Sequence, residues 1–204
     1  GLTEYLPVSS TGHLILAQRA MGIEHDPAAN AYAICIQAGA ILAVLGLYWR
    51  RVRQMAVGGL GLVGVTRRDD EGLRLGVNIV AAFLPAAVVG LLFNDVIEEQ
   101  LFGLWPVVAA WFVGGVAILL TVAWRKRRAG EERAGLDLAD MTWRMAVLIG
   151  VIQCVAMWPG VSRSLVTIVG GVLVGLSLVA AVEFSFLLGV ITLTGLGLKF
   201  SDIA

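Results

Sequence analysis

Three long apolar stretches constrain the fold of this chain more than any other feature. They run over residues 31–49, 75–93 and 103–124. Each is close to the roughly 20 apolar residues that a helix needs to cross a bilayer. A fourth stretch, residues 180–198, is equally apolar except for Glu183. Because a chain inside a bilayer must satisfy its backbone hydrogen bonds internally, these stretches predict an all-α, polytopic membrane protein.

The composition supports this class and excludes others. Apolar residues make up 58% of the chain and charged residues 15%, against about 45–50% and about 25% in soluble domains. The formal net charge is zero, so the overall basicity typical of a nucleic-acid binder is absent and we expect no nucleic-acid partner. Cys35 and Cys154 lie in apolar stretches without a Cys-x-x-Cys spacing, and we expect both to be packing residues.

The charged loops predict the orientation of the spans. Basic residues follow the first and third spans, within residues 50–68 and 125–128. The intervening loop, residues 94–100, is acidic. The positive-inside rule places both basic loops in the cytoplasm. We interpret all of these charge runs as solvated flanks.

Two further apolar regions, residues 1–22 and 145–178, are broken by prolines and hydroxyl residues, and they resemble each other. The first contains Pro-Val-Ser-Ser-Thr-Gly over residues 7–12, and the second contains Pro-Gly-Val-Ser-Arg-Ser over residues 159–164. Aligning Ser9 with Ser162 gives an offset of 153 residues. Chance similarity between apolar segments rich in glycine and serine is the alternative.

The similarity predicts one membrane domain over residues 1–204 built from two inverted-topology repeats. The repeats cover approximately residues 1–49 and 145–200, and spans 75–93 and 103–124 join them. The three clean spans between the two breaks are an odd number of crossings, which inverts the second repeat. Broken, re-entrant helix pairs in such repeats commonly form a binding site near the membrane midplane. Gln37 and Gln153 are expected to form interhelical hydrogen bonds.

Each break carries the residues of an anion site. Ser and Thr are favoured N-caps, and a helix N-terminus attracts phosphate. Arg163 lies in the second break, while Glu4 and His13 flank the first. An arginine at membrane depth usually has a function or a partner, and its guanidinium binds phosphate in a bidentate fork.

Together these residues suit phosphoryl transfer, in which a hydroxyl or water attacks and a His or Glu takes the proton. A carboxylate could bind a divalent cation such as Mg²⁺ or Ca²⁺. Each residue also has a structural alternative. Arg163 could cap carbonyls, His13 could pack, Glu4 could lie solvated at the interface, and the hydroxyls could be N-caps alone. Glu183 either pairs with a buried arginine or lies at the end of its span.

Two strings resemble the signatures of a known family. Gly-Leu-Thr-Glu-Tyr-Leu-Pro-Val-Ser-Ser-Thr-Gly-His-Leu over residues 1–14 is similar to the first signature of the bacterial undecaprenyl-diphosphatase family, the bacitracin-resistance type. Residues 159–164 with Thr167 resemble the second. Supporting matches lie at residues 36–41, 83–87 and 183–188. The resemblance covers essentially the whole chain.

The resemblance implies a multi-pass enzyme of the bacterial inner membrane that hydrolyses undecaprenyl diphosphate to undecaprenyl phosphate and inorganic phosphate. This reaction recycles the lipid carrier of peptidoglycan and cell-wall synthesis. It requires a divalent cation, Mg²⁺ or Ca²⁺. The implied partners are the polyprenyl diphosphate lipid and the bilayer, and a homodimer is compatible with this assignment.

The resemblance also assigns roles to individual residues. Ser10 matches the candidate nucleophile, His13 its proton partner, and Arg163 the phosphate clamp. Glu4 would be the second acid of a Glu-x-x-x-Glu motif and the metal ligand. The remaining residues expected to line the substrate site are Ser9, Thr11, Ser162, Ser164 and Thr167.

Three departures from the family pattern stand out. The first Glu of the Glu-x-x-x-Glu motif would fall one residue before Gly1. Leu165 stands where the family usually has glycine, so a larger side chain is expected to crowd the second break. The family is longer, and we expect the chain to be a fragment without about two C-terminal helices.

A polyprenyl-lipid flippase or transporter with a midplane anion site is the alternative function, because broken inverted repeats are also a transporter architecture. A non-catalytic assembly protein would leave the repeated polar breaks unexplained.

Overall fold

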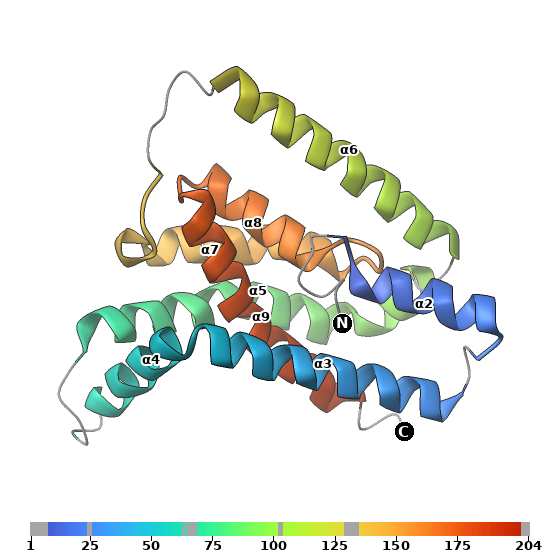
Figure 1. The fold of residues 1–204 in the computed structure, drawn as a ribbon, viewed down its shortest axis with the longest axis horizontal. Helices are drawn as coiled ribbons and strands as arrows, with labels where there is room; N and C mark the ends of the chain where they lie inside the picture. The colour runs from blue at the N-terminus through green and yellow to red at the C-terminus, as the bar shows by residue number, and fades with distance from the viewer. Residues whose placement is uncertain are drawn as a thin grey trace.

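The described part of the chain is all-α. The computed structural model describes residues 8–23, 26–62, 64, 69–101, 104–128 and 135–200. Within them the only pairing of extended backbone is an isolated bridge between Leu136 and Leu176. The helices, labelled as in Figure 1, are α2 (Ser10–Met21), α3 (Pro27–Leu47), α4 (Trp49–Leu62), α5 (Asp70–Leu101), α6 (Leu104–Arg128), α7 (Trp143–Gln153), α8 (Arg163–Leu173) and α9 (Leu178–Phe200), with short 3-10 helices η1 (Leu138–Asp140) and η2 (Cys154–Met157).

Three of the described helices are long and apolar enough to cross a membrane, over Pro27–Leu47, Asp70–Phe93 and Leu104–Thr121. They correspond to the three predicted clean spans. The fourth predicted stretch lies in α9, which continues to Phe200 and is apolar over Leu178–Thr194, the part whose side chains the structure describes. Large apolar side chains on these helices are open to the surroundings, including Leu42 at 68% exposure and Phe112 at 74%. Such surfaces suit a lipid environment and not water.

The core lies where α5, α7 and α9 meet. Ile79, Ile149 and Phe184 come from these three helices, and each is at most 1% exposed. Glycine allows the backbones to approach closely, because a Cβ at Gly150 of α7 would overlap the carbonyl group of Ala82 on α5. Small residues serve this purpose in membrane helix packing.

The first part of the basic flank predicted over residues 50–68 is a helix and not a loop, although Arg50 and Arg53 in it are exposed as predicted. These residues belong to α4, which packs against α5. Its closest approach joins two glycines, because a Cβ at Gly58 would overlap the backbone nitrogen of Leu73 and one at Gly72 would overlap the Gln54 carbonyl. A helix therefore continues almost directly from α3 and returns along the start of α5 (Figure 1).

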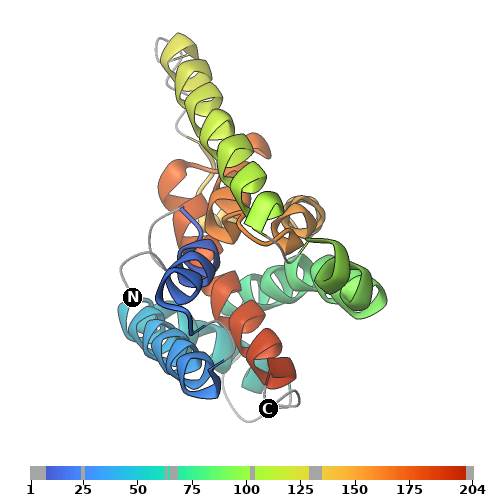
Figure 2. The same ribbon diagram turned by 90° about the vertical axis from the view of Figure 1, so that its right-hand side faces the viewer.

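The second half of the chain forms a hairpin. α7 and α8 are joined by η2 and a turn, and α8 packs against both α7 and α9. α6 lies at the periphery in both views and approaches the remaining helices near its beginning (Figures 1 and 2). The turn before α8 lies beside the start of α2 in both views.

The helix bounds follow the offset of 153 residues. Added to α2 and α3, this offset gives residues 163–174 and 180–200, close to the bounds of α8 and α9. In Figure 1, α2 and α9 run from left to right, whereas α8 and α3 run from right to left. Corresponding helices thus point in opposite directions in this view. The repeat boundaries and the re-entrant arrangement in a membrane stay predictions.

Candidate active site

Both breaks start a helix with the same serine cap. Ser9 precedes α2, and its Oγ accepts a hydrogen bond from the backbone N–H of Gly12 at 3.4 Å. Ser162 precedes α8, and its Oγ accepts from the N–H of Leu165 at 3.3 Å. Ser9 and Ser162 are 7% and 6% exposed. The predicted capping by hydroxyls is therefore confirmed at these two positions, and two helix N-termini begin inside the structure.

Trp111 in the early turns of α6 packs against the first broken region, at the start of α2. An added Cβ at Gly12 would lie 2.6 Å from Nε1 of Trp111, so only a glycine fits against this indole without displacing it. The His13 ring packs on the same indole, with ring centroids 4.8 Å apart. The start of α2 is thereby fixed to one face of α6.

The same part of α6 also contacts the second broken region, which precedes α8. The indole N–H of Trp158 donates to the Pro106 carbonyl at 3.1 Å. Gly160 has φ +96° and lies so close to α6 that a Cβ would be 2.9 Å from the Val107 carbonyl oxygen. A Cβ added at Gly114 of α6 would lie 3.9 Å from Leu165 Cδ2, an ordinary contact distance. The expected crowding of the second break by Leu165 stays a prediction.

The Arg163 side chain extends from the start of α8 toward α3 and α9. An added Cβ at Gly189 of α9 would lie 2.5 Å from Nη1 and 2.7 Å from Nη2 of Arg163. The guanidinium also borders a small cavity lined mainly by apolar groups of α3 and α9, namely Ala40, Ile41, Val44, Phe186, Val190 and Leu193. A cationic group thus lies beside the second helix N-terminus, among apolar walls.

A set of buried hydroxyls stabilises this helix start. The Oγ atoms of Ser162 and Ser164 are 3.1 Å apart. Thr167 Oγ1 donates to the Arg163 carbonyl at 2.9 Å and lies 2.6 Å from Ser185 Oγ on α9. Thr167 Oγ1 also lies 3.2 Å from the Ser164 carbonyl oxygen, and either hydroxyl of the Thr167–Ser185 pair could be the donor. Thr167 is only 1% exposed, so it lies behind the helix start.

The residues predicted on the first break are only partly described. Ser10 is the half-buried first residue of α2. His13 is exposed, and its Nδ1 lies 2.8 Å from the Ser9 carbonyl oxygen. If Nδ1 carries the proton of this hydrogen bond, Nε2 is left as the basic nitrogen. Glu4 and the side chain of Thr11 lie outside the described residues. α6 brings the two helix starts together, but no described contact joins Ser10 or His13 to Arg163.

Comparison with known proteins identifies the family. The family described as "Bacitracin resistance protein BacA" matches residues 1–203. The chain belongs to this family. A protein named undecaprenyl-diphosphatase from Sorangium cellulosum is 49% identical over 95% of this chain and 60% of its own length. Proteins of the same name from Variovorax paradoxus and Clostridium perfringens are 43% and 37% identical, over 97% and 96% of this chain and 68% and 70% of their own lengths. The predicted family is thus confirmed, and the chain spans about two thirds of the length of these relatives. With its three long apolar helices, it is a membrane protein.

The described residues alone do not form a cation site. No group of three or more His, Cys, Asp or Glu side chains among them is placed to hold a metal ion. The predicted ligand Glu4 lies outside this part of the chain. Cation dependence therefore stays a prediction.

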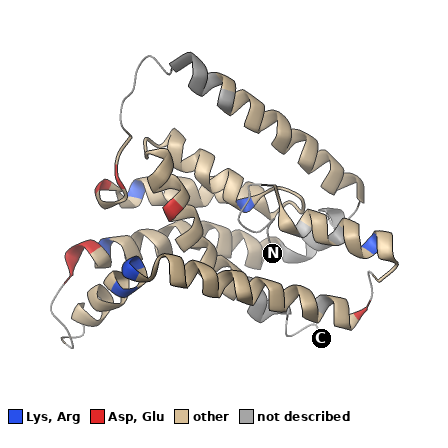
Figure 3. Cartoon of the chain, in the orientation of Figure 1, with Lys and Arg blue, Asp and Glu red and all other residues tan. Residues whose placement is uncertain are grey.

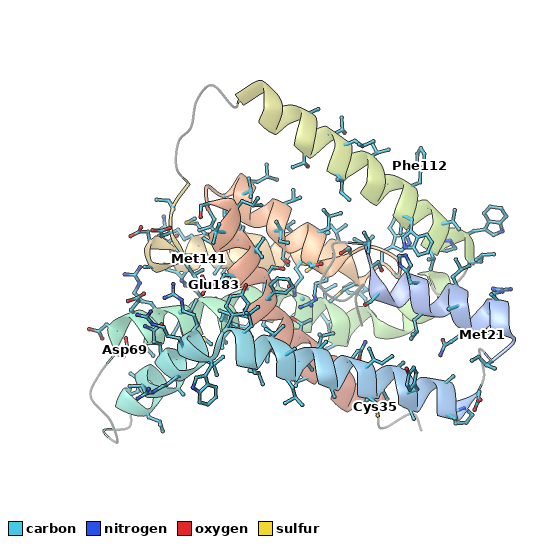
Figure 4. The ribbon with its side chains drawn as sticks, in the orientation of Figure 1. Met21, Cys35, Asp69, Phe112, Met141 and Glu183 are labelled. Atoms are coloured by element: carbon cyan, nitrogen blue, oxygen red, sulfur yellow. The ribbon has the colours of Figure 1, made fainter. Side chains whose placement is uncertain are left out.

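A partly buried ion pair between helices was predicted only in part. Arg51 Nε of α4 donates to Glu183 Oε1 of α9 at 2.9 Å, and Arg51 Nη1 lies 3.1 Å from Glu71 Oε1 of α5. Figure 3 shows charges of both signs gathered at this end of the molecule, and Figure 4 labels Glu183 there. Pairing of Glu183 with an arginine is confirmed, whereas the interpretation of Arg51 as a solvated flank was wrong.

Burial and the charge of Glu183 shift the pKa values of Arg51 and Tyr48. Burial opposes the charged form of Arg51, but its hydrogen bonds and charge interactions with Glu183 and Glu71 outweigh this effect and raise its pKa. Burial, with a smaller contribution from the Glu183 charge, raises the pKa of Tyr48. Arg51 therefore stays cationic and Tyr48 neutral at physiological pH.

Two minor expectations were wrong. Gln153 is 2% exposed, but neither polar atom of its side chain has a hydrogen-bond partner among the described residues. Cys35 is exposed on α3, so it does not pack in the core. Cys154 is half-buried, and its Sγ lies 3.5 Å from the Gly150 carbonyl oxygen, as a packing residue would.

Proposed function

We propose that this chain provides the catalytic part of a membrane phosphatase that hydrolyses undecaprenyl diphosphate to undecaprenyl phosphate and inorganic phosphate. One observation carries the proposal: two serine-capped helix N-termini lie against the same turns of α6, and Arg163 lies beside the second. Such N-termini and a guanidinium both attract phosphate. The relatives are named undecaprenyl-diphosphatases, which favours hydrolysis over the transporter alternative.

The charge of the substrate matches this arrangement. A diphosphate carries several negative charges on a long apolar tail, so a helix-lined site in a bilayer can bind both parts. Arg163 and the N–H groups at the starts of α2 and α8 would stabilise the charge that develops on the terminal phosphate. Ser162 and Ser164 would order the first turn of α8, with Ser9 and Thr11 in the equivalent place on α2.

The proposed reaction takes place at the first broken region, at the start of α2. The oxygen of Ser10, or of a water, attacks the terminal phosphorus, and the bond from this phosphorus to the bridging oxygen breaks. Undecaprenyl phosphate leaves with the electron pair of that bond. His13 Nε2 takes the proton of the attacking hydroxyl, because Nδ1 is already engaged with the Ser9 carbonyl. If Ser10 attacks, a water must then release phosphate from the serine.

We further propose the inverted-repeat arrangement, with two re-entrant pairs in a multi-pass protein of the bacterial inner membrane. The shared offset of the helix bounds and the opposite directions of α2 and α8 support it. Dependence on Mg²⁺ or Ca²⁺ through Glu4 is proposed on the family resemblance, since an acidic oxygen ligand suits such hard cations.

Phosphate release from undecaprenyl diphosphate in detergent tests the function. The 204-residue chain and the same chain extended by its flanking coding sequence are measured with Mg²⁺, with Ca²⁺ and with a chelator. We expect cation-dependent release that Ser10→Ala and Arg163→Ala each reduce by about 10²-fold or more. Folded protein that binds the lipid but releases no phosphate would overturn the enzyme and favour the flippase. Release that survives Ser10→Ala alone would assign the attack to water.

A further inference from the structure

Two residues of α9, Ser185 and Gly189, face the start of α8. They are four residues apart and therefore lie on one face of the helix, one turn from each other. Ser185 Oγ is 2.6 Å from Thr167 Oγ1. The Arg163 guanidinium occupies the space where a Gly189 side chain would be. The guanidinium of Arg163 thus contacts α9 directly at Gly189, and its carbonyl is connected to α9 through Thr167 and Ser185.

We propose that α9 positions Arg163 for the phosphate through Ser185 and Gly189. Thr167 Oγ1 lies 2.6 Å from Ser185 Oγ and 2.9 Å from the Arg163 carbonyl oxygen, so this hydroxyl pair joins the Arg163 backbone to α9. Gly189 provides the flat surface on which the guanidinium lies. This inference rests on the proposed function of Arg163 as the phosphate-binding group. Ser185 and Gly189 are positioning residues and do not touch the substrate themselves.

The contact at Gly189 allows the position of the Arg163 guanidinium to be changed without a change in the fold. An alanine Cβ at residue 189 would meet Nη1 at 2.5 Å, Nη2 at 2.7 Å and Cζ at 3.0 Å of Arg163. All three atoms are at the far end of a flexible side chain, which can move without displacing a helix. Alanine also favours helix more than glycine does. Gly189→Ala should therefore displace the guanidinium while the fold is kept.

The hydroxyl groups of Ser185 and Thr167 depend on each other for hydrogen bonding, because both are buried. Ser185 and Thr167 are each 1% exposed, so water cannot replace a lost partner. Ser185→Ala leaves Thr167 its bond to the Arg163 carbonyl but removes the group that orients the Thr167 hydroxyl. Thr167→Ser keeps the hydroxyl and serves as the conservative rescue, whereas Thr167→Val removes it at similar volume.

The test measures kcat, KM, lipid binding and the thermal midpoint for the full chain in detergent. Gly189→Ala is compared with Gly115→Ala on α6, where an added Cβ has nothing within 4 Å. We expect Gly189→Ala to raise KM and Kd for undecaprenyl diphosphate about tenfold or more with an unchanged midpoint, and Gly115→Ala to behave like wild type. Thr167→Val and Ser185→Ala should lower kcat/KM, and Thr167→Ser should recover most of it.

The outcomes distinguish this inference from the proposed function. Wild-type protein that neither binds nor hydrolyses the lipid would overturn the proposed function and this inference with it. Wild-type protein that binds without hydrolysis tests the inference by Kd alone. If Arg163→Ala loses activity or binding while Gly189→Ala matches wild type in both, the function stands and the positioning by α9 is contradicted. A fall in midpoint that accounts for the loss in Ser185→Ala would contradict its positioning role.

Discussion

At the residue scale, Gly12 shows how one missing side chain builds the site. It lies between the serine cap of α2 and the indole of Trp111, and His13 packs on the same ring. Only a residue without a Cβ lets α2 begin directly against α6. The first break therefore depends on a contact that cannot be read from its own string of residues, because Trp111 is 99 positions away.

We expect Gly12→Ala to lower activity more than tenfold, since the added Cβ would lie 2.6 Å from Trp111 Nε1 and displace either the indole or the helix start. Overpacking of this kind costs about 1–3 kcal/mol, so a moderate loss of stability should accompany it. The measurements are phosphate release and the unfolding midpoint in detergent. Gly39→Ala on α3, where nothing lies within 4 Å of an added Cβ, is the control. Equal effects of both substitutions would contradict the contact.

The Arg51–Glu183 pair yields a prediction about stability. The side chains are 28% and 17% exposed, so removal of Arg51 leaves a carboxylate that water reaches poorly. We expect Arg51→Ala to destabilise the protein by about 1–3 kcal/mol, the range for removing one partner of a hydrogen bond and leaving the other unsatisfied. A double-mutant cycle with Glu183→Gln should show coupling between the two residues. Additive effects would show that the pair contributes nothing.

At the element scale, the sequence predicted the helices whose signal is local. Apolar runs of span length identified α3, α5 and α6, and the serine caps identified the starts of α2 and α8. α4 was missed because its three arginines resemble a solvated flank. The partner of Arg51, 132 residues away, has no local signal either. Ser185 was equally hidden, although it belongs to a string at residues 183–188 that resembles the family.

Helix packing gives the prediction at this scale. A Cβ at Gly150 would overlap the carbonyl group of Ala82, and backbone cannot move aside as a side chain can. We expect Gly150→Ala to separate α5 from α7 and to cost about 2 kcal/mol or more, as a strained core substitution. The unfolding midpoint measures this effect, and Gly59→Ala on α4, with nothing within 4 Å, is the comparison. A midpoint unchanged in Gly150→Ala would contradict the close packing.

At the scale of the whole molecule, the charged side chains that the structure describes lie mainly at one end. In Figure 3 the acidic and basic residues gather where α3 is followed by α4 and where α5 begins. The apolar lengths of the helices lie between that end and the opposite one, which carries Asp26 and Arg19 at the connection of α2 to α3. This distribution suits a protein whose two ends face water on opposite sides of a bilayer.

Labelling of single cysteines tests this orientation. In a background without Cys35 and Cys154, Asp69→Cys should react with an impermeant maleimide only after the cytoplasmic side is exposed, following the positive-inside rule. Asp26→Cys at the other end of α3 should react in intact cells. Permeabilised cells, in which both sites react, are the control. Labelling of both sites from the same side would contradict the crossing of α3.

The proposed function requires that the two helix starts bind one diphosphate, with Arg163 as the clamp and Ser10 as the reacting group or its neighbour. Equilibrium binding of undecaprenyl diphosphate to Ser10→Ala and to Arg163→Ala tests it most directly. Ser10→Ala should bind the lipid within a few-fold of wild type while its phosphate release is lost. Arg163→Ala should bind about tenfold or more weakly, because a charge-assisted bidentate contact is removed. Wild-type affinity in Arg163→Ala would contradict the account.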